Sequence, residues 1–143
     1  MSVAHEPLLT YRGAVYPWHC DHMRHMNVMW YVGKFDEATW NLFATLGLTR
    51  QFLAANERGM AAVEQNIAYK RELIEGDVVS IYTQVLEIKD RVIRFSHEMR
   101  SGDGAEIAAT TILTAVHLDT AARKATAFPA DVKDKAQALL ATR

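Results

Sequence analysis

A change of hydrophobic period is the strongest constraint on how this chain folds. Between Tyr31 and Leu46, apolar residues recur every three or four positions, which is the spacing of an amphipathic helix. From Val63 onward, apolar and polar residues alternate instead, and this period of two is typical of strands. A long helix followed by consecutive strands predicts an antiparallel sheet with the helix packed on one face.

Turn-forming residues mark where the predicted elements end. A first strand over residues 8–16 stops at Pro17, and the long helix stops at Gly47. The other predicted elements are a short helix over residues 50–58 closed by Gly59, strands over residues 63–71, 79–88, 92–100 and 106–119, a hairpin turn over residues 101–104 and a last helix over residues 131–140. The predicted fold class is α+β, with a five-stranded antiparallel sheet around one long central helix.

Composition and charge narrow the class of protein. With 143 residues, 50% of them hydrophobic, the chain suits a single folded domain over residues 1–143. A net charge of −1 favours neither nucleic acid nor a membrane surface as partner, and no apolar run reaches the roughly 20 residues that cross a bilayer. The first residues lack signal-peptide features and Cys20 is the only cysteine, so we expect a cytoplasmic protein. A sheet that a helix covers on one face leaves other apolar surface that needs a partner, so we expect a homodimer or homotetramer.

The most reactive side chains gather between Trp18 and Trp40. This stretch contains Asp21, an acid placed shortly before the predicted start of the long helix. Unpaired N–H groups and the positive end of the helix dipole can hold a carboxylate there, or the oxyanion of a carbonyl under attack. The pattern therefore indicates either acyl-transfer chemistry by Asp21 or a carboxylate that only caps the helix or a turn.

The same stretch also has the residue types of a metal site, because histidine, cysteine and aspartate all bind zinc. The residues concerned are His19, Cys20, Asp21, His22 and His25. Their spacing matches no standard zinc pattern, and a cluster within one loop rarely supplies a complete tetrahedral set. We therefore predict no metal.

Four residues of this stretch resemble a known family signature. Asp21, His25, Asn27 and Tyr31 match the D-x-x-x-H-x-N-x-x-x-Y pattern of the 4-hydroxybenzoyl-CoA thioesterase-like acyl-CoA thioesterases, which have the hotdog fold. The resemblance continues in residues 35–38, 69–73, 76–77 and 102–104, and so covers nearly the whole chain. Two positions depart from the family: Arg24 stands where glycine is usual, and His19 where a second acid is frequent.

This resemblance implies hydrolysis of an acyl-CoA to a free acid and CoA, with no cofactor, since CoA is part of the substrate. Asp21 would attack the thioester carbonyl or activate water, and N–H groups around residues 27–29 would polarise the carbonyl oxygen. Asn27 would orient water or the thioester, and His25 would lend a hydrogen bond or a proton. For Asn27 and His25, a purely scaffolding role stays open.

The resemblance also suggests which residues contact the substrate. The predicted acyl-group contacts are Val28, Trp30, Tyr31 and Glu64, with Glu64 reaching the cleft across a dimer or simply solvated. The aromatic residues could line an acyl pocket or, with Glu64, hold a quaternary ammonium group. Residues 25–40 resemble thioesterases of carnitine and betaine metabolism, which points to betainyl-CoA or another small acyl-CoA. The predicted contacts to the CoA phosphates are Lys70, Arg71 and Arg91.

Two other functions are compatible with a hotdog domain. One is a non-catalytic protein that binds acyl-CoA or an acyl carrier. The other is a dehydratase or hydratase, which would need an aspartate and a histidine acting as a pair on the substrate.

Overall fold

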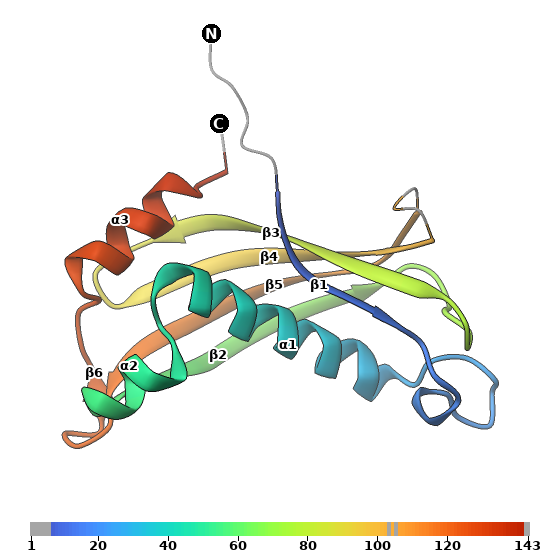
Figure 1. Cartoon of the computed structure of the whole chain (residues 1–143), viewed down its shortest axis with the longest axis horizontal. Helices are drawn as coiled ribbons and strands as arrows, with labels where there is room; N and C mark the ends of the chain where they lie inside the picture. The colour runs from blue at the N-terminus through green and yellow to red at the C-terminus, as the bar shows by residue number, and fades with distance from the viewer. Residues whose placement is uncertain (1–6, 103, 105, 142–143) are drawn as a thin grey trace, which may run out of the picture.

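The computed structural model describes residues 7–102, 104 and 106–141, which form one curved sheet with three helices (Figure 1). In chain order the elements are β1 (Leu8–Ala14), the short 3-10 helix η1 (Pro17–His19), α1 (Val28–Leu46), α2 (Arg50–Ala55), β2 (Arg58–Tyr69), β3 (Val78–Ile88), β4 (Val92–Ser101), β5 (Glu106–Asp119), β6 (Lys124–Ala125) and α3 (Ala130–Ala138). No helix in these ranges is long and apolar enough to span a bilayer.

The sheet has the strand order β1-β3-β4-β5-β2, with every neighbouring pair antiparallel and the two-residue β6 added beside β5. Helix α1 runs along the sheet on one side (Figure 1). The predicted five-stranded sheet around one long helix is therefore confirmed. The predicted turn over residues 101–104 includes Asp103, which lies outside the described residues.

The end of α1 follows its sequence signals, whereas the end of α2 does not. Gly47 takes a left-handed φ of 98° and its N–H donates to Phe43 and Ala44, which closes α1 as predicted. Helix α2, however, stops at Ala55, and Gly59 lies inside β2 opposite Leu118. The predicted helix begins at Arg50 as expected. Its predicted extension to residue 58 and stop at Gly59 are wrong, because pairing with β5 extends β2 back to Arg58 and overrides the local turn signal.

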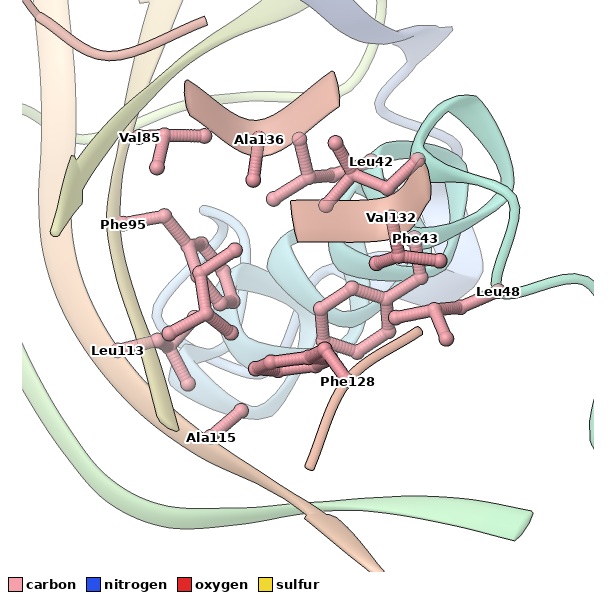
Figure 2. Packing of buried hydrophobic residues seen from close by; sticks show 12 residues of the cluster. Leu42, Phe43, Leu48, Val85, Phe95, Leu113, Ala115, Phe128, Val132 and Ala136 are labelled. Carbon is pink, nitrogen blue, oxygen red and sulfur yellow. The ribbon is translucent and has the colours of Figure 1, made fainter. Parts of the chain in front are cut away.

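The apolar stripe of α1 faces the sheet. Phe35, Ala38, Leu42 and Leu46 are all at most 1% exposed. At one end of the core, Leu42 and Phe43 from α1 lie beside Phe95 from β4 and Val132 from α3 (Figure 2). Burying a side chain of this size stabilises the fold by about 1.5–3 kcal/mol, so the stripe and its partners account for the position of α1 on the sheet.

A buried polar chain joins α1 to three strands. His97 of β4 is 1% exposed, with Thr39 Oγ1 2.8 Å from its Nε2 and Thr83 Oγ1 2.6 Å from its Nδ1. Thr83 Oγ1 in turn lies 2.8 Å from Thr10 Oγ1 in β1. Burial lowers the pKa of His97 to about 3. The ring is therefore neutral, and both nitrogens are paired inside the core.

The low pKa of His97 makes stability depend on pH. Below the ordinary histidine pKa of about 6.5 the unfolded chain binds a proton that the folded chain does not, so the free energy of unfolding falls as the pH drops from about 6.5 toward 3. The expected loss from this group is about 2–3 kcal/mol at pH 4.5. Urea unfolding at pH 7 and pH 4.5 should show this loss in the wild type and a smaller one in His97→Leu. Equal losses in both proteins would contradict the assignment.

Candidate active site

The loop before α1 is a closed, well-anchored turn. An antiparallel bridge between Cys20 and Met26 closes it, and within it the Asp21 N–H donates to the His25 carbonyl (3.2 Å). The Met26 N–H donates to the Leu73 carbonyl at 2.7 Å, so the loop is also tied to the segment that follows β2. These bonds hold the backbone of Asp21 in one place relative to the sheet.

Arg24 has a left-handed φ of 69° in this turn. Its N–H donates to the Asp21 carbonyl at 2.9 Å, which completes the tight turn. For a residue other than glycine this conformation costs about 1–2 kcal/mol, which explains why glycine suits the position in the family that the sequence resembles. The turn is nevertheless formed with arginine at this position.

Both carboxylate oxygens of Asp21 accept a hydrogen bond. Oδ2 accepts from Asn27 Nδ2 and Oδ1 accepts from the Met23 N–H, each at 2.8 Å. These donors, the Asn27 amide foremost, lower the pKa of Asp21. Asp21 is therefore an oriented carboxylate that stays ionised in mildly acidic solution, while it remains partly exposed to solvent.

The Asn27 side chain has two partners at once. Its amide nitrogen donates to Asp21, and its Oδ1 accepts from the Met29 N–H at 2.9 Å, which makes Asn27 the N-cap of α1. Since only an oxygen can accept from Met29, the orientation of the amide is determined. One residue thus both caps the helix and holds Asp21.

Of the N–H groups at the start of α1, the one on Val28 is available. Asn27 N donates to the His19 carbonyl, Met29 N to the Asn27 side chain and Trp30 N to the Asn27 carbonyl. Within the described part of the chain, Val28 N forms no hydrogen bond. A free N–H at a helix N-terminus is suited to a developing oxyanion. Of the backbone N–H groups of residues 27–29 that were predicted to polarise the substrate carbonyl, the one on Val28 is therefore the candidate that remains.

An open cleft of about 660 Å³ lies where α1 begins, between the loop and the end of β2. It is lined by His25, Met26, Val28, Tyr31, Tyr69, Lys70, Arg71 and Glu72. The Tyr31 hydroxyl donates to the Arg71 carbonyl at 2.9 Å, and its ring meets Tyr69 edge to face with centroids 5.2 Å apart. The structure therefore brings five of the predicted site residues to one cleft. They are His25, Val28, Tyr31, Lys70 and Arg71.

Of the five predicted site residues that do not line this cleft, Asp21 and Asn27 lie in the loop just before α1, and the other three lie elsewhere. Arg91 is in the β3–β4 turn, near the end of the sheet covered by α3 and far from the start of α1 (Figure 1). Trp30 packs on the buried His19 ring, with centroids 4.6 Å apart. Glu64 pairs with Thr114, between two core residues of β5, so its side chain is on the sheet face away from α1. None of the three lines the cleft.

Tyr69 and Glu72 were not predicted as site residues, although both line the cleft. Glu72 directly follows the predicted strand over residues 63–71, where functional residues tend to lie, whereas Tyr69 lies inside that strand. Both belong to the motif over residues 69–73 that resembles the family. Glu72 accepts from His25, with 2.9 Å between Oε2 and Nε2. Among the residues described, no three histidine, cysteine, aspartate or glutamate side chains converge as a metal site would require.

Comparison with known proteins identifies a family. The model of the thioesterase-like superfamily matches residues 15–136. The long-chain acyl-CoA thioesterase FadM of Escherichia coli (strain K12) is 23% identical over 127 residues, covering 86% of this chain and 92% of that protein. The L-carnitine dehydrogenase/betainyl-CoA thioesterase of Agrobacterium fabrum (strain C58 / ATCC 33970) is 29% identical over 109 residues, which cover 76% of this chain and 22% of that protein.

Solved structures share the fold. A Staphylococcus aureus protein in complex with CoA superposes with a TM-score of 0.88 at 19% identity, over 99% of this chain and 92% of that one. The family model, the order of the strands and this superposition agree along nearly the whole chain. The chain therefore belongs to the thioesterase-like superfamily of hotdog-fold thioester hydrolases.

Proposed function

We propose that this protein is an acyl-CoA thioesterase in which Asp21 carries out the hydrolytic step. The observation that carries the proposal is the double use of Asn27, which orients an ionised Asp21 and caps the helix whose first N–H, on Val28, is free. A carboxylate and an oxyanion donor are thereby joined through one side chain, and the residue that carries the donor, Val28, lines the open cleft. Family membership supports the activity at the level of thioester hydrolysis.

The reaction can take either of two courses. In one, an Asp21 oxygen attacks the thioester carbonyl, CoA leaves as the thiolate, and water hydrolyses the resulting anhydride. In the other, Asp21 removes a proton from a water that attacks the carbonyl. Both need the ionised carboxylate, and in both the charge that develops on the carbonyl oxygen is stabilised by the Val28 N–H. Neither course requires a metal or a redox cofactor.

The CoA portion is expected to reach the cleft from the side of Lys70. Arg71 is already paired with Glu106 at 2.6 Å, whereas Lys70 has no ion-pair partner in the described part of the chain. An unpaired ammonium suits a phosphate. The S. aureus neighbour with CoA supports this part of the proposal.

For the acyl group we propose betainyl or another small acyl chain. The relative from A. fabrum, whose name includes a betainyl-CoA thioesterase, supports this choice, whereas the E. coli relative acts on long chains. A dehydratase is less suited to the geometry. No loop histidine side chain hydrogen-bonds to the Asp21 carboxylate among the residues described, and the His25 ring pairs with Glu72 instead.

Replacing Asp21 tests the proposal directly. Asp21→Asn keeps the size of the side chain and removes the charge, so the release of CoA from acyl-CoA, followed with a thiol reagent, should fall roughly a thousandfold. Asp134→Asn, an exposed change on α3, is the matched control and should keep wild-type turnover. Full activity in Asp21→Asn would rule out the assigned role. Binding of acyl-CoA by the wild type without any release of thiol would instead identify a non-catalytic binder.

The pH profile tests the link between Asn27 and Asp21. The Asn27 amide lowers the pKa of Asp21, so activity that needs the carboxylate should persist to low pH in the wild type. Asn27→Asp keeps a good N-cap but loses the amide donor and places a second carboxylate beside Asp21, which raises the pKa of the pair. The acid limb of kcat/KM should therefore move to higher pH, with an unchanged helical circular dichroism signal. An acid limb in the same place as in the wild type would disprove the link.

We also infer that the protein forms a homo-oligomer through β2. The two edges of the sheet differ. Along β1, side chains of α1 bind the edge carbonyls, with Asn41 donating to Thr10 at 2.5 Å and the buried Lys34 to Ala14 at 3.3 Å. Strand β2 is 12 residues long, and residues 62–66 are all exposed. An uncovered edge of this length favours pairing with a second copy, and any role for Glu64 at a cleft rests on such pairing.

Sedimentation velocity can test the choice of edge. Val63 on β2 is 62% exposed and Leu9 on β1 is 50% exposed, so each can take a lysine without disturbing the core. Val63→Lys should shift the protein toward a monomer, because like charges would meet across a pair of β2 strands. Leu9→Lys is the control and should not shift it. The opposite result would place the interface at β1.

The lone Cys20 suits a reducing compartment, so we infer a cytoplasmic enzyme, which cell fractionation would check.

A further inference from the structure

The cleft contains a carboxylate next to aromatic rings, and the proposed reaction uses none of these groups. Glu72 lines the cleft with its side chain 73% exposed, and His25 holds it at 2.9 Å. Tyr31 and Tyr69 line the same cleft, with their rings at 86° to each other. Because the Tyr31 hydroxyl is bound to the Arg71 carbonyl, its ring has a defined orientation.

Glu72 acts electrostatically on the Tyr31 hydroxyl. Burial chiefly raises the pKa of Tyr31, and the charge of Glu72 raises it further. The charge of Glu72 therefore lies close to the Tyr31 side chain. Across the cleft wall, the positive charge of Arg71 is offset by Glu106 at 2.6 Å. Beside the tyrosines the cleft presents aromatic rings and the Glu72 carboxylate, while Lys70, which lines the same cleft, is assigned to the CoA phosphates.

Such surroundings favour one class of ligand. The faces of aromatic rings attract cations, and a nearby carboxylate adds to the attraction. A quaternary ammonium group cannot donate hydrogen bonds, so it is recognised by ring faces and by charge rather than by a hydrogen-bonding partner. An acyl group that ends in a carboxylate is repelled at the same place.

We propose that Glu72, together with Tyr31 and Tyr69, selects acyl groups that carry a quaternary ammonium close to the thioester over neutral groups of the same shape and over anionic ones. The inference rests on the proposed thioesterase function and deepens it by assigning the choice of substrate to particular residues. The sequence pattern suggested Glu64 and the tryptophans for recognition of a quaternary ammonium group. The present proposal assigns that recognition instead to residues in the wall of the cleft at the end of β2.

A set of three thioesters separates charge from shape. Trimethylammonioacetyl-CoA and 3,3-dimethylbutanoyl-CoA differ only by nitrogen in place of carbon, so they have the same shape and differ by one positive charge. Succinyl-CoA supplies an anionic acyl group. The ratio of kcat/KM for the cationic thioester to that for its neutral isostere measures the selection. It should be roughly tenfold or more in the wild type, and succinyl-CoA should be the poorest substrate.

Paired variants assign the selection to residues. Glu72→Gln should lower the cationic-to-neutral ratio by about tenfold, whereas Glu75→Gln, in the neighbouring turn and outside the cleft, should leave the ratio as in the wild type. Tyr69→Leu should lower the ratio by a few-fold, and Tyr69→Phe, which keeps the aromatic face, should restore it. The same ratio in Glu72→Gln and the wild type, or equal ratios in the two Tyr69 variants, would overturn the proposal.

The test also distinguishes failure of this inference from failure of the proposed function. Ketone analogues in which a methylene group replaces the thioester sulfur cannot be hydrolysed, so their dissociation constants report charge selection without catalysis. If no thioester is cleaved, the proposed function fails, while a preference for the cationic analogue that is lost in Glu72→Gln still supports the inference. If all three thioesters are cleaved without regard to charge, the thioesterase stands and the inference is wrong.

Discussion

The packing of one amphipathic helix on one sheet governs this structure. Helix α1 buries Phe35, Leu42 and Leu46 against the strands, and no second long helix shares that role in the part of the chain that is described. Its position along the sheet determines where its N-terminus lies, and hence where a free N–H can meet a substrate. The same packing leaves β2 uncovered, so the interactions that form the core also leave an edge open to a second copy.

At the start of that helix, structure and chemistry depend on one side chain. Asn27 caps the N-terminus of α1 through its amide oxygen and holds Asp21 through its amide nitrogen. A residue that only capped the helix would leave the carboxylate free to turn, and one that only bound Asp21 would leave the Met29 N–H without a partner. Sharing the amide couples the orientation of the acid to the geometry of the helix, which is a form of preorganisation.

Much of the fold could be predicted because its signals are local. The period of α1, the stop at Gly47 and the bounds of β5 follow from residues close in sequence. The errors arose where distant pairing outweighed local preference. Gly59 was predicted to close a helix but lies in β2, because its backbone pairs with β5 there. For the site, the loop from Asp21 to Asn27 could be predicted, since these residues lie within one turn before the helix.

By itself, the sequence determined the class of fold and the acid before the long helix, because both depend on spacing along the chain. That Asn27 caps the helix came from the structure. Only the tertiary structure decided which residues share the cleft. It brought Tyr69 and Glu72 beside Tyr31 and placed Arg91 far from them, although all were plausible on composition. The physical reason is that a side chain's neighbours depend on strand order, register and face, and these are determined by contacts between residues far apart in sequence.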